Sequence, residues 1–209
     1  MHLPDHIDLR WESFDSEQAE TWTSLLSDEE QERLETFKSV KRKRAFALGR
    51  TSARRLLAGR LGVAPEAVPL HVAPDGAVEV DGSPYHLSIA HTEEYAVVAA
   101  AERDIGVDLE RIVPRRPDLY RFLFYPEDYP LFEALELDRA HAHVLCWTLK
   151  EATLKAMRTG FRRSPKDVRL SINTAAQSAR AQVDGRRWQL QFEERSGCYL
   201  TVAYDGTEG

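Results

Sequence analysis

Two short segments of the chain carry acidic and basic side chains at spacings that could support chemistry. In the segment Gly106–Glu110 (GVDLE), Asp108 and Glu110 are one residue apart, so on a β-strand both carboxylates point to the same face. Two such carboxylates repel each other unless they lie in solvent or share a cation, and hard oxygen ligands suit Mg²⁺. The pentapeptide alone therefore leaves two interpretations open, a solvated strand end and part of a magnesium site.

The second segment, 147–156 (WTLKEATLKA), places Trp147, Glu151 and Lys155 on one stripe of a helix. A Glu four residues before a Lys is also the favoured orientation of an ordinary helix salt bridge. The aromatic ring on the same stripe indicates a partly buried face, where a Glu–Lys pair is costly unless it is well paired or used. His91, at the end of a third segment, is either a capping residue after a strand or a ligand for phosphate.

Basic residues concentrate in 38–44, which holds five of them in seven positions, although the chain has 34 acidic and 28 basic side chains and a net charge of −6. A local basic cluster in an acidic protein favours a phosphate-bearing small molecule or an acidic partner, and a solvated helix face is the alternative. The overall charge argues against non-specific binding of nucleic acid.

The composition of the 209 residues, 43% hydrophobic and 30% charged, is that of a globular protein. The chain has no long apolar stretch and no basic-then-apolar start, so we expect no membrane span and no signal peptide, and a cytoplasmic location. Cys146 and Cys198 are too few for a disulfide scaffold or a four-ligand zinc site. The motifs of P-loop hydrolases, Rossmann dehydrogenases, zincins and α/β-hydrolases are absent.

The elements that must position these residues follow from periodicity and turn signals. Ser27 and Glu30 form a capping box that predicts a helix over 27–36, and apolar spacing predicts a second helix over 40–61 that ends at Gly62. Further helices are expected over 118–138 and 141–159. Turns are expected at Asp75-Gly76, Asp81-Gly82 and Asp184-Gly185, and short strands at 77–80, 85–89, 95–101, 105–109, 168–172, 179–183, 188–193 and 199–203.

Each half of the chain therefore shows helices first and then a group of antiparallel strands. The proline-flanked basic segment 111–117 is the best candidate for a linker between the halves. We predict an α+β fold with two similar subdomains, residues 1–110 and 111–209.

The ordered set of motifs resembles the 4′-phosphopantetheinyl transferases. The segment GVDLE matches the family pattern G-[IV]-D-[ILV]-E, and Trp147 to Lys155 matches W-x-x-K-E-[AS]-x-x-K. Residues 46–57 (FALGRTSARRLL) are similar to the family helix F-x-x-G-R-x-x-x-R-x-L-L. The resemblance runs from about Ser27 to Phe161, and the chain length is similar to that of the monomeric, internally doubled Sfp type.

This resemblance implies a pseudo-twofold pair of subdomains and an enzyme that transfers the phosphopantetheine arm of coenzyme A to a serine of an apo acyl or peptidyl carrier protein, releasing adenosine 3′,5′-bisphosphate. It implies that Asp108, Glu110 and Glu151 hold Mg²⁺ at the interface of the two halves, and that Lys155 neutralises charge on the phosphoryl group. Either Glu151 or a metal-bound water would deprotonate the serine. The implied contacts of coenzyme A are Lys41, Arg44, Arg54, His91 and Lys150, whereas Arg50 can be structural.

Two positions depart from the family pattern on the coenzyme side. Ser83 stands where the family has a lysine, and Ala90 stands where it has a serine beside the histidine. These losses are the support for an alternative, a non-catalytic module that binds coenzyme A or a carrier protein. A magnesium-dependent nucleic-acid enzyme is a third hypothesis, against which the net charge and the lack of a basic stripe with interleaved aromatic residues argue.

Overall fold

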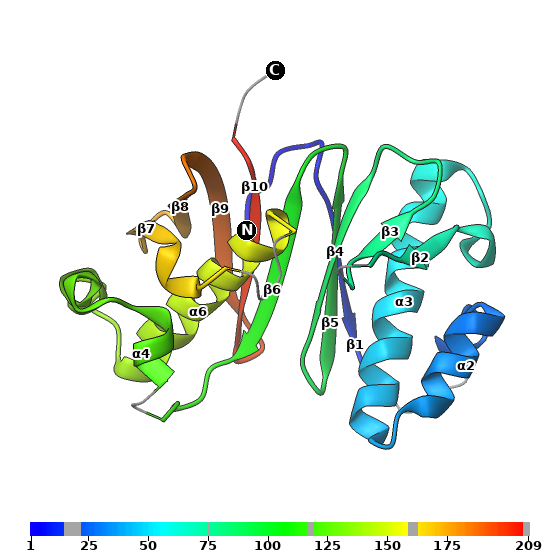
Figure 1. The fold of residues 1–209 in the computed structure, drawn as a ribbon, viewed down its shortest axis with the longest axis horizontal. Helices are drawn as coiled ribbons and strands as arrows, with labels where there is room; N and C mark the ends of the chain where they lie inside the picture. The colour runs from blue at the N-terminus through cyan, green and yellow to red at the C-terminus, as the bar shows by residue number, and fades with distance from the viewer. Residues whose placement is uncertain (15–21, 75, 117–118, 159–162, 207–209) are drawn as a thin grey trace. The chain divides into compact units, whose positions relative to one another are not determined.

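The computed structural model describes residues 1–14, 22–74, 76–116, 119–158 and 163–206. The chain divides into two compact units, one of Asp5–Glu102 and one of Arg103–Gly209 together with Met1–Pro4. The sequence placed the boundary after residue 110, whereas strand β6 (Ile105–Arg111) belongs to the second unit because it pairs along its whole length with β10 (Cys198–Asp205). Each unit is α+β (Figure 1).

In the unit Asp5–Glu102, a long helix packs on a small antiparallel sheet. The sheet has the order β1–β5–β4, and helix α3 lies along it (Figure 1). The central strand β5 is buried from Ala96 to Ala101, as its unbroken apolar sequence predicts. The bounds are β1 Asp8–Ser13, α3 Val40–Leu61, β4 His86–His91 and β5 Tyr95–Ala101, and a separate hairpin pairs β2 Leu70–Val72 with β3 Val78–Val80.

The helices of this unit begin and end where their capping residues predict. Helix α2 (Asp28–Thr36) has Ser27 as its N-cap, and Ser27 and Glu30 form the expected capping box. Helix α3 begins after Ser39, whose side chain accepts from the backbone N–H of Arg42, and ends at Gly62 in the left-handed conformation.

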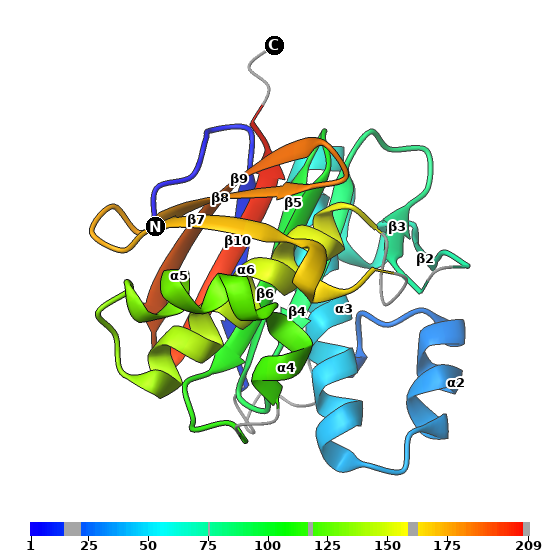
Figure 2. The same ribbon diagram turned by 60° about the vertical axis from the view of Figure 1, so that its left-hand side comes forward.

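In the second unit, helix α6 (Arg139–Ala156) packs against an antiparallel sheet of order β6–β10–β9–β8–β7 (Figure 2). Its core joins Leu145 and Leu149 of α6 to Trp188 and Leu190 of the sheet. The tight turn at Asp184-Gly185 has positive φ at both residues, as the sequence predicts for this hairpin. The remaining bounds are β7 Arg169–Asn173, β8 Ser178–Val183 and β9 Arg186–Arg195.

Some elements differ from the sequence prediction. The helix expected over 118–138 is broken into α4 (Tyr120–Leu123), a 3₁₀ turn Pro126–Asp128 and α5 (Tyr129–Glu133). Proline disfavours the helical conformation of the residue before it, and Tyr125 is accordingly extended. Strand β1 was not predicted, and strand β6 opens the segment Arg103–Gly209, so the order "helices first" is wrong for both units. The turn at Asp75-Gly76 includes a residue outside the described ranges.

No helix in the described ranges combines the length and the apolar character needed to cross a membrane.

Candidate active site

The strand β6 presents its acidic residues to helix α6, because a glycine on the same face lets the helix approach. Gly106, Asp108 and Glu110 alternate with the buried Val107 and Leu109. A Cβ atom at Gly106 would collide with the carbonyl oxygen of Ala152 and the backbone nitrogen of Ala156, both on α6. The glycine of the GVDLE segment is therefore needed for the contact between strand and helix.

Helix α6 is fixed in place at its N-terminus and at its middle. Asp138 caps its N-terminus by accepting from the backbone N–H groups of Ala140 and His141. In the middle, the hydroxyl of Thr201 on β10 donates to the hydroxyl of Thr148 on α6 across 3.1 Å. Strand β10 pairs with β6, so the same hydrogen-bonded framework holds the helix and the acidic strand.

A hydrogen-bonded ion pair between Lys155 and Asp108 joins the two predicted motifs. The Lys155 ammonium donates to Asp108 Oδ1 at 2.7 Å and to the Val107 carbonyl oxygen at 3.1 Å. The Asp108 side chain is 8% exposed and that of Lys155 is 34% exposed. Asp108 Oδ2 is buried and has no hydrogen-bond partner in the part of the chain that the structure describes. A buried carboxylate oxygen without a partner is uncommon and points to a missing ligand.

Glu110 and Glu151 add negative charge beside this pair. Burial raises the pKa of Glu110, and repulsion from Asp108 raises it further, although Arg115 donates to its carboxylate at 2.6 Å and opposes the shift. Burial also raises the pKa of Glu151, with Asp108 again adding to the shift and Lys155 opposing it. The three acids thus interact electrostatically and are incompletely neutralised by their own cations.

The donor chemistry of the acids fits a hard divalent cation. Carboxylate oxygens are the ligands that Mg²⁺ prefers, and Asp108 Oδ2 has no partner among the described residues that would prevent it from binding a cation. Among the described residues, however, no group of three or more His, Cys, Asp or Glu side chains is arranged as a metal site. The acids expected as ligands are therefore brought into one electrostatic cluster without converging on a single point.

Both motifs of this cluster lie in one unit of the fold. Strand β6 and helix α6 both belong to the unit that contains Arg103–Gly209. The sequence placed the two motifs in different halves and so expected the metal residues at the interface of those halves. The pairing of β6 with β10 shows instead that both motifs belong to the same unit.

Lys150, expected to contact coenzyme A, has a structural environment. Its side chain is almost fully buried, and its ammonium donates to the carbonyl oxygens of Leu123, Pro165 and Val168 at 2.8 to 3.0 Å. Burial lowers its pKa to about 8. Since all three donors are used by the backbone, Lys150 joins the segments around α6 and has no donor left for a phosphate.

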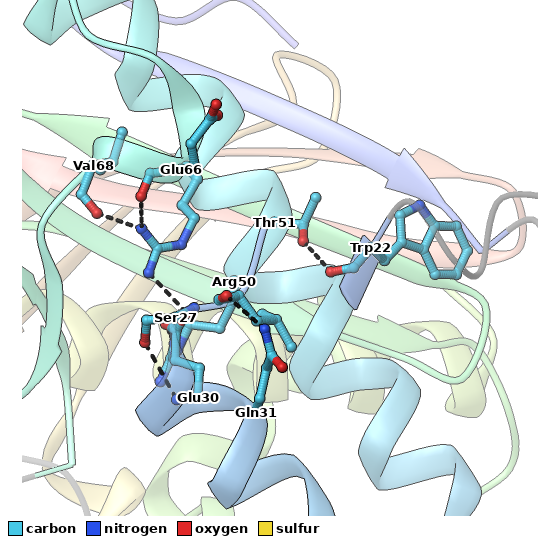
Figure 3. Close-up of polar contacts among 10 residues, drawn as sticks. Trp22, Ser27, Glu30, Gln31, Arg50, Thr51, Glu66 and Val68 are labelled. Carbon is cyan, nitrogen blue, oxygen red and sulfur yellow. Dashed lines mark hydrogen bonds and ion pairs between the residues drawn. The ribbon is translucent and has the colours of Figure 1, made fainter. Parts of the chain in front are cut away.

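Arg54, also expected to contact coenzyme A, is buried and bonded to groups inside the protein. Figure 3 shows the buried network in which Glu30 and the carbonyl groups of Glu66 and Val68 lie. Arg54 donates to Glu30 Oε2 at 2.8 Å and to those two carbonyl oxygens. It is 2% exposed, so it holds α2 against α3. Arg50 shares the carboxylate of Glu30 at 3.3 Å and is structural as well.

Lys41, Arg44 and His91 remain on the surface of the unit Asp5–Glu102. Lys41 pairs with Glu93 at 2.5 Å, which brings the start of α3 beside the segment that follows His91. The guanidinium of Arg44 lies 4.5 Å from the centre of the Phe14 ring. The fold therefore gathers these three expected phosphate-binding residues at one end of α3.

Two residues near the acids were missed by sequence reasoning. A pocket in the second unit is lined by Glu110, Arg115, Leu119, His143, Val144 and Trp147. His143 continues the stripe of Trp147, Glu151 and Lys155 at the same spacing of four, so the helical period could have identified it. Arg115 has no comparable signal, because it lies in the irregular segment after β6.

Comparison with known proteins gives matches over most of the chain. Residues 104–203 match a model described as the 4′-phosphopantetheinyl transferase superfamily, and residues 29–101 match one described as the 4′-phosphopantetheinyl transferase N-terminal domain. The site cluster falls entirely within the first of these matches.

Individual relatives carry the same name. A Synechocystis sp. protein, slr0495, provisionally named a 4′-phosphopantetheinyl transferase, is 33% identical over 67% of this chain and 60% of its own length. A 4′-phosphopantetheinyl transferase of Bacillus subtilis is 24% identical over 66% of this chain and 62% of its own length. The 4′-phosphopantetheinyl transferase gsp of Aneurinibacillus migulanus is 25% identical over 66% of this chain and 59% of its own length. The match thus spans about three fifths of these relatives.

Proposed function

Because the chain belongs to the 4′-phosphopantetheinyl transferase superfamily, we propose that it transfers the phosphopantetheine arm of coenzyme A to a serine of an apo acyl or peptidyl carrier protein. The product left behind is adenosine 3′,5′-bisphosphate. The observation that carries the proposal is the contact between the two motifs: Lys155 bonds one oxygen of Asp108 and leaves the other buried and without a partner in the described ranges, beside Glu110 and Glu151.

The acids would hold Mg²⁺ in this reaction. Asp108, Glu110 and Glu151 supply the carboxylate oxygens, and the open oxygen of Asp108 supports this assignment. When bound, the cation neutralises charge on the pyrophosphate of coenzyme A and acts as a Lewis acid. The raised pKa values of Glu110 and Glu151 reflect the uncompensated negative charge that such a cation would relieve.

The chain's own residues then act on the serine and the phosphate. The serine oxygen forms a bond to the phosphorus that carries pantetheine, and the bond from that phosphorus to the bridging oxygen of the pyrophosphate breaks. We assign the serine proton to Glu151, one of the two acceptors expected from the sequence, because its carboxylate belongs to the acid cluster. The ammonium of Lys155 stays beside the reacting phosphate and stabilises the charge that develops on its oxygens.

The coenzyme is bound at its adenosine end by the surface cations of the unit Asp5–Glu102. Lys41, Arg44 and His91 are the expected partners of its phosphates, and their placement at one end of α3 supports this part of the proposal. Lys150 is removed from the set because its three donors are used inside the protein, and Arg54 because its side chain is buried against Glu30. The lysine that the family carries at Ser83 is not replaced by another cation at that position.

The wider setting stays a prediction from the sequence. We expect a cytoplasmic monomer that acts on a small-molecule coenzyme and a carrier protein, without nucleic acid or membrane as partner. The pathway of the carrier (fatty-acid, polyketide, peptide or siderophore synthesis) is left open.

Intact mass spectrometry of an apo carrier protein tests the proposal. The carrier is incubated with this protein, coenzyme A and Mg²⁺, and a matched sample contains EDTA. We expect the carrier to gain one phosphopantetheine arm, and the gain to disappear with EDTA. No gain across acyl and peptidyl carriers, with coenzyme A still bound, would favour a non-catalytic binding module. No gain and no binding would contradict both functions.

A further inference from the structure

The pocket beside Glu110 contains a buried polar side chain for which the mechanism above has no use. His143 is fully buried, and neither of its ring nitrogens has a hydrogen-bond partner among the described residues. The centroids of the His143 and Tyr120 rings lie 4.1 Å apart. Val144 and Trp147, on the same helix as His143, line the same pocket. A buried imidazole without a partner is costly to the fold unless a ligand supplies the missing hydrogen bond.

The ring of His143 recognises a ligand by hydrogen bonding and not by its own charge. Arg115 donates to Glu110 at 2.6 Å, so the two charged side chains that line the pocket are paired with each other. Burial and the nearby Arg115 and Arg139 lower the pKa of His143 to about 4, which keeps the ring neutral. A neutral imidazole offers one N–H donor and one acceptor nitrogen, and a secondary amide can satisfy either of them.

The size and lining of the pocket limit the ligand further. The pocket encloses about 60 Å³, well below the usual range for sites that hold a whole small molecule. Its walls at Leu119, Val144 and Trp147 are apolar. The pocket therefore has room for one short segment of a longer ligand, such as a single amide, and it is too small for a nucleotide.

We propose that this pocket binds an amide of the pantetheine arm of coenzyme A, with His143 as the residue that recognises it. The inference rests on the proposed function, because Glu110 belongs both to the acid cluster and to the pocket wall. A phosphate held at the acids would place the start of the arm beside the pocket. The arm is uncharged between its phosphate and its thiol, and it carries two secondary amides separated by methylene groups.

Calorimetry with two ligands tests the assignment. Coenzyme A and adenosine 3′,5′-bisphosphate share the adenosine phosphates, but only coenzyme A carries the arm. We expect His143→Phe to weaken coenzyme A by about 5- to 10-fold, as for the loss of one hydrogen bond, and to leave the bisphosphate unchanged. His143→Gln, which keeps an amide donor and acceptor, should restore part of the affinity.

A matched control is present on the same helix. His141 lies two residues before His143, contacts Asp138 and Glu194, and does not line the pocket. His141→Phe should leave the affinities of both ligands unchanged. Equal weakening of both ligands by His143→Phe, or no weakening of coenzyme A, would overturn the inference.

A measurement on the wild-type protein avoids reliance on variants that fold poorly. The imidazole nitrogen resonances of His143, followed by NMR, should shift when coenzyme A is added and stay in place when the bisphosphate is added. A resonance that ignores coenzyme A at saturation overturns the inference alone, since the coenzyme is then bound without contact to His143. Failure of both ligands to bind overturns the proposed function together with this inference.

Discussion

The two units of the fold each bury a carboxylate, Glu30 in one and Asp108 in the other, and these two carboxylates differ in how many of their oxygens have partners. Glu30 uses both oxygens: Oε2 accepts from Arg54 and from the backbone N–H of Ser27, and Oε1 pairs with Arg50. Asp108 uses one oxygen for Lys155 and leaves the other without a partner in the described part of the chain. Complete pairing fixes a structure, whereas a buried group left open is available to a ligand.

The same contrast holds between two lysines of helix α6. Lys150 donates all three of its hydrogens to backbone carbonyl groups, and Lys155 reaches the acidic strand with its side chain one third exposed. Both belong to one motif in the sequence, yet Lys150 connects segments of the fold and Lys155 pairs with Asp108 of the proposed site. Charge type and motif membership are therefore weaker guides to function than the partners a side chain already has.

The largest expected effect is a loss of turnover, and it concerns the incompletely paired cluster around Asp108. Glu151→Gln should lower kcat/KM by about 10²- to 10⁴-fold, the usual contribution of a positioned proton acceptor. The melting temperature should stay the same or rise, because the variant removes a carboxylate that repels Asp108. Steady-state transfer assays and thermal unfolding measure both quantities. Glu133→Gln, an exposed glutamate on α5, is the control and should change neither.

The second largest expected effect is a loss of stability, and it concerns the fully paired carboxylate of Glu30. Glu30→Gln leaves Arg50 and Arg54 without their shared anion and should lower the free energy of unfolding by about 3 to 5 kcal/mol. Asp108→Asn should lower it by about 1 kcal/mol at most, because its partner Lys155 is partly exposed. Urea unfolding of both variants checks the ranking. Equal losses would remove the distinction between the two clusters.

The free energy of unfolding should also depend on pH through His143, by an amount similar to the effect of Glu30→Gln. The folded protein lowers the pKa of this ring from 6.5 to about 4, so between these values the unfolded chain binds the extra proton. Stability from this group is present above pH 6.5 and is lost as the pH falls toward 4, by about 3 kcal/mol. His143→Phe lacks this dependence. Unfolding curves of both proteins should diverge over this interval, and parallel pH profiles would contradict the expectation.

The smallest of these effects concerns the close approach of α6 to β6. Gly106→Ala places a Cβ against the backbone of Ala152 and Ala156 and should cost about 1 to 3 kcal/mol in stability. Turnover should fall as well, since the shift separates Lys155 from Asp108. Gly59→Ala on α3 has open space around the new Cβ and should be neutral or stabilising. A fully active Gly106→Ala enzyme would show that the helix position is not critical.

Sequence reasoning succeeded where local rules decide the structure. The Ser27–Glu30 capping box, the helix 40–61 that ends at Gly62, and the buried strand 95–101 all follow from short-range signals. The alternation that puts Asp108 and Glu110 on one face is also confirmed, because it depends on the period of a strand alone.

It failed where distant parts of the chain decide. The pairing of β6 with β10 joins residues about 90 to 100 positions apart, and it places the acidic strand in the second unit. The backbone carbonyl groups that accept hydrogen bonds from Arg54 and Lys150 come from separate segments of the chain. No local sequence pattern therefore shows that these cations already have partners. Strand β1 has period-two alternation at Leu9 and Trp11, a signal that could have found it.

The most direct test of the account measures transfer as a function of Mg²⁺ concentration. Wild-type protein and the Asp108→Ala variant are compared with coenzyme A and an apo carrier, from limiting to saturating Mg²⁺. The account predicts that the variant loses turnover at limiting Mg²⁺, where the wild-type protein is still active, while both remain folded. Full turnover of the variant at limiting Mg²⁺ would show that Asp108 holds no metal and would contradict the assignment of the site.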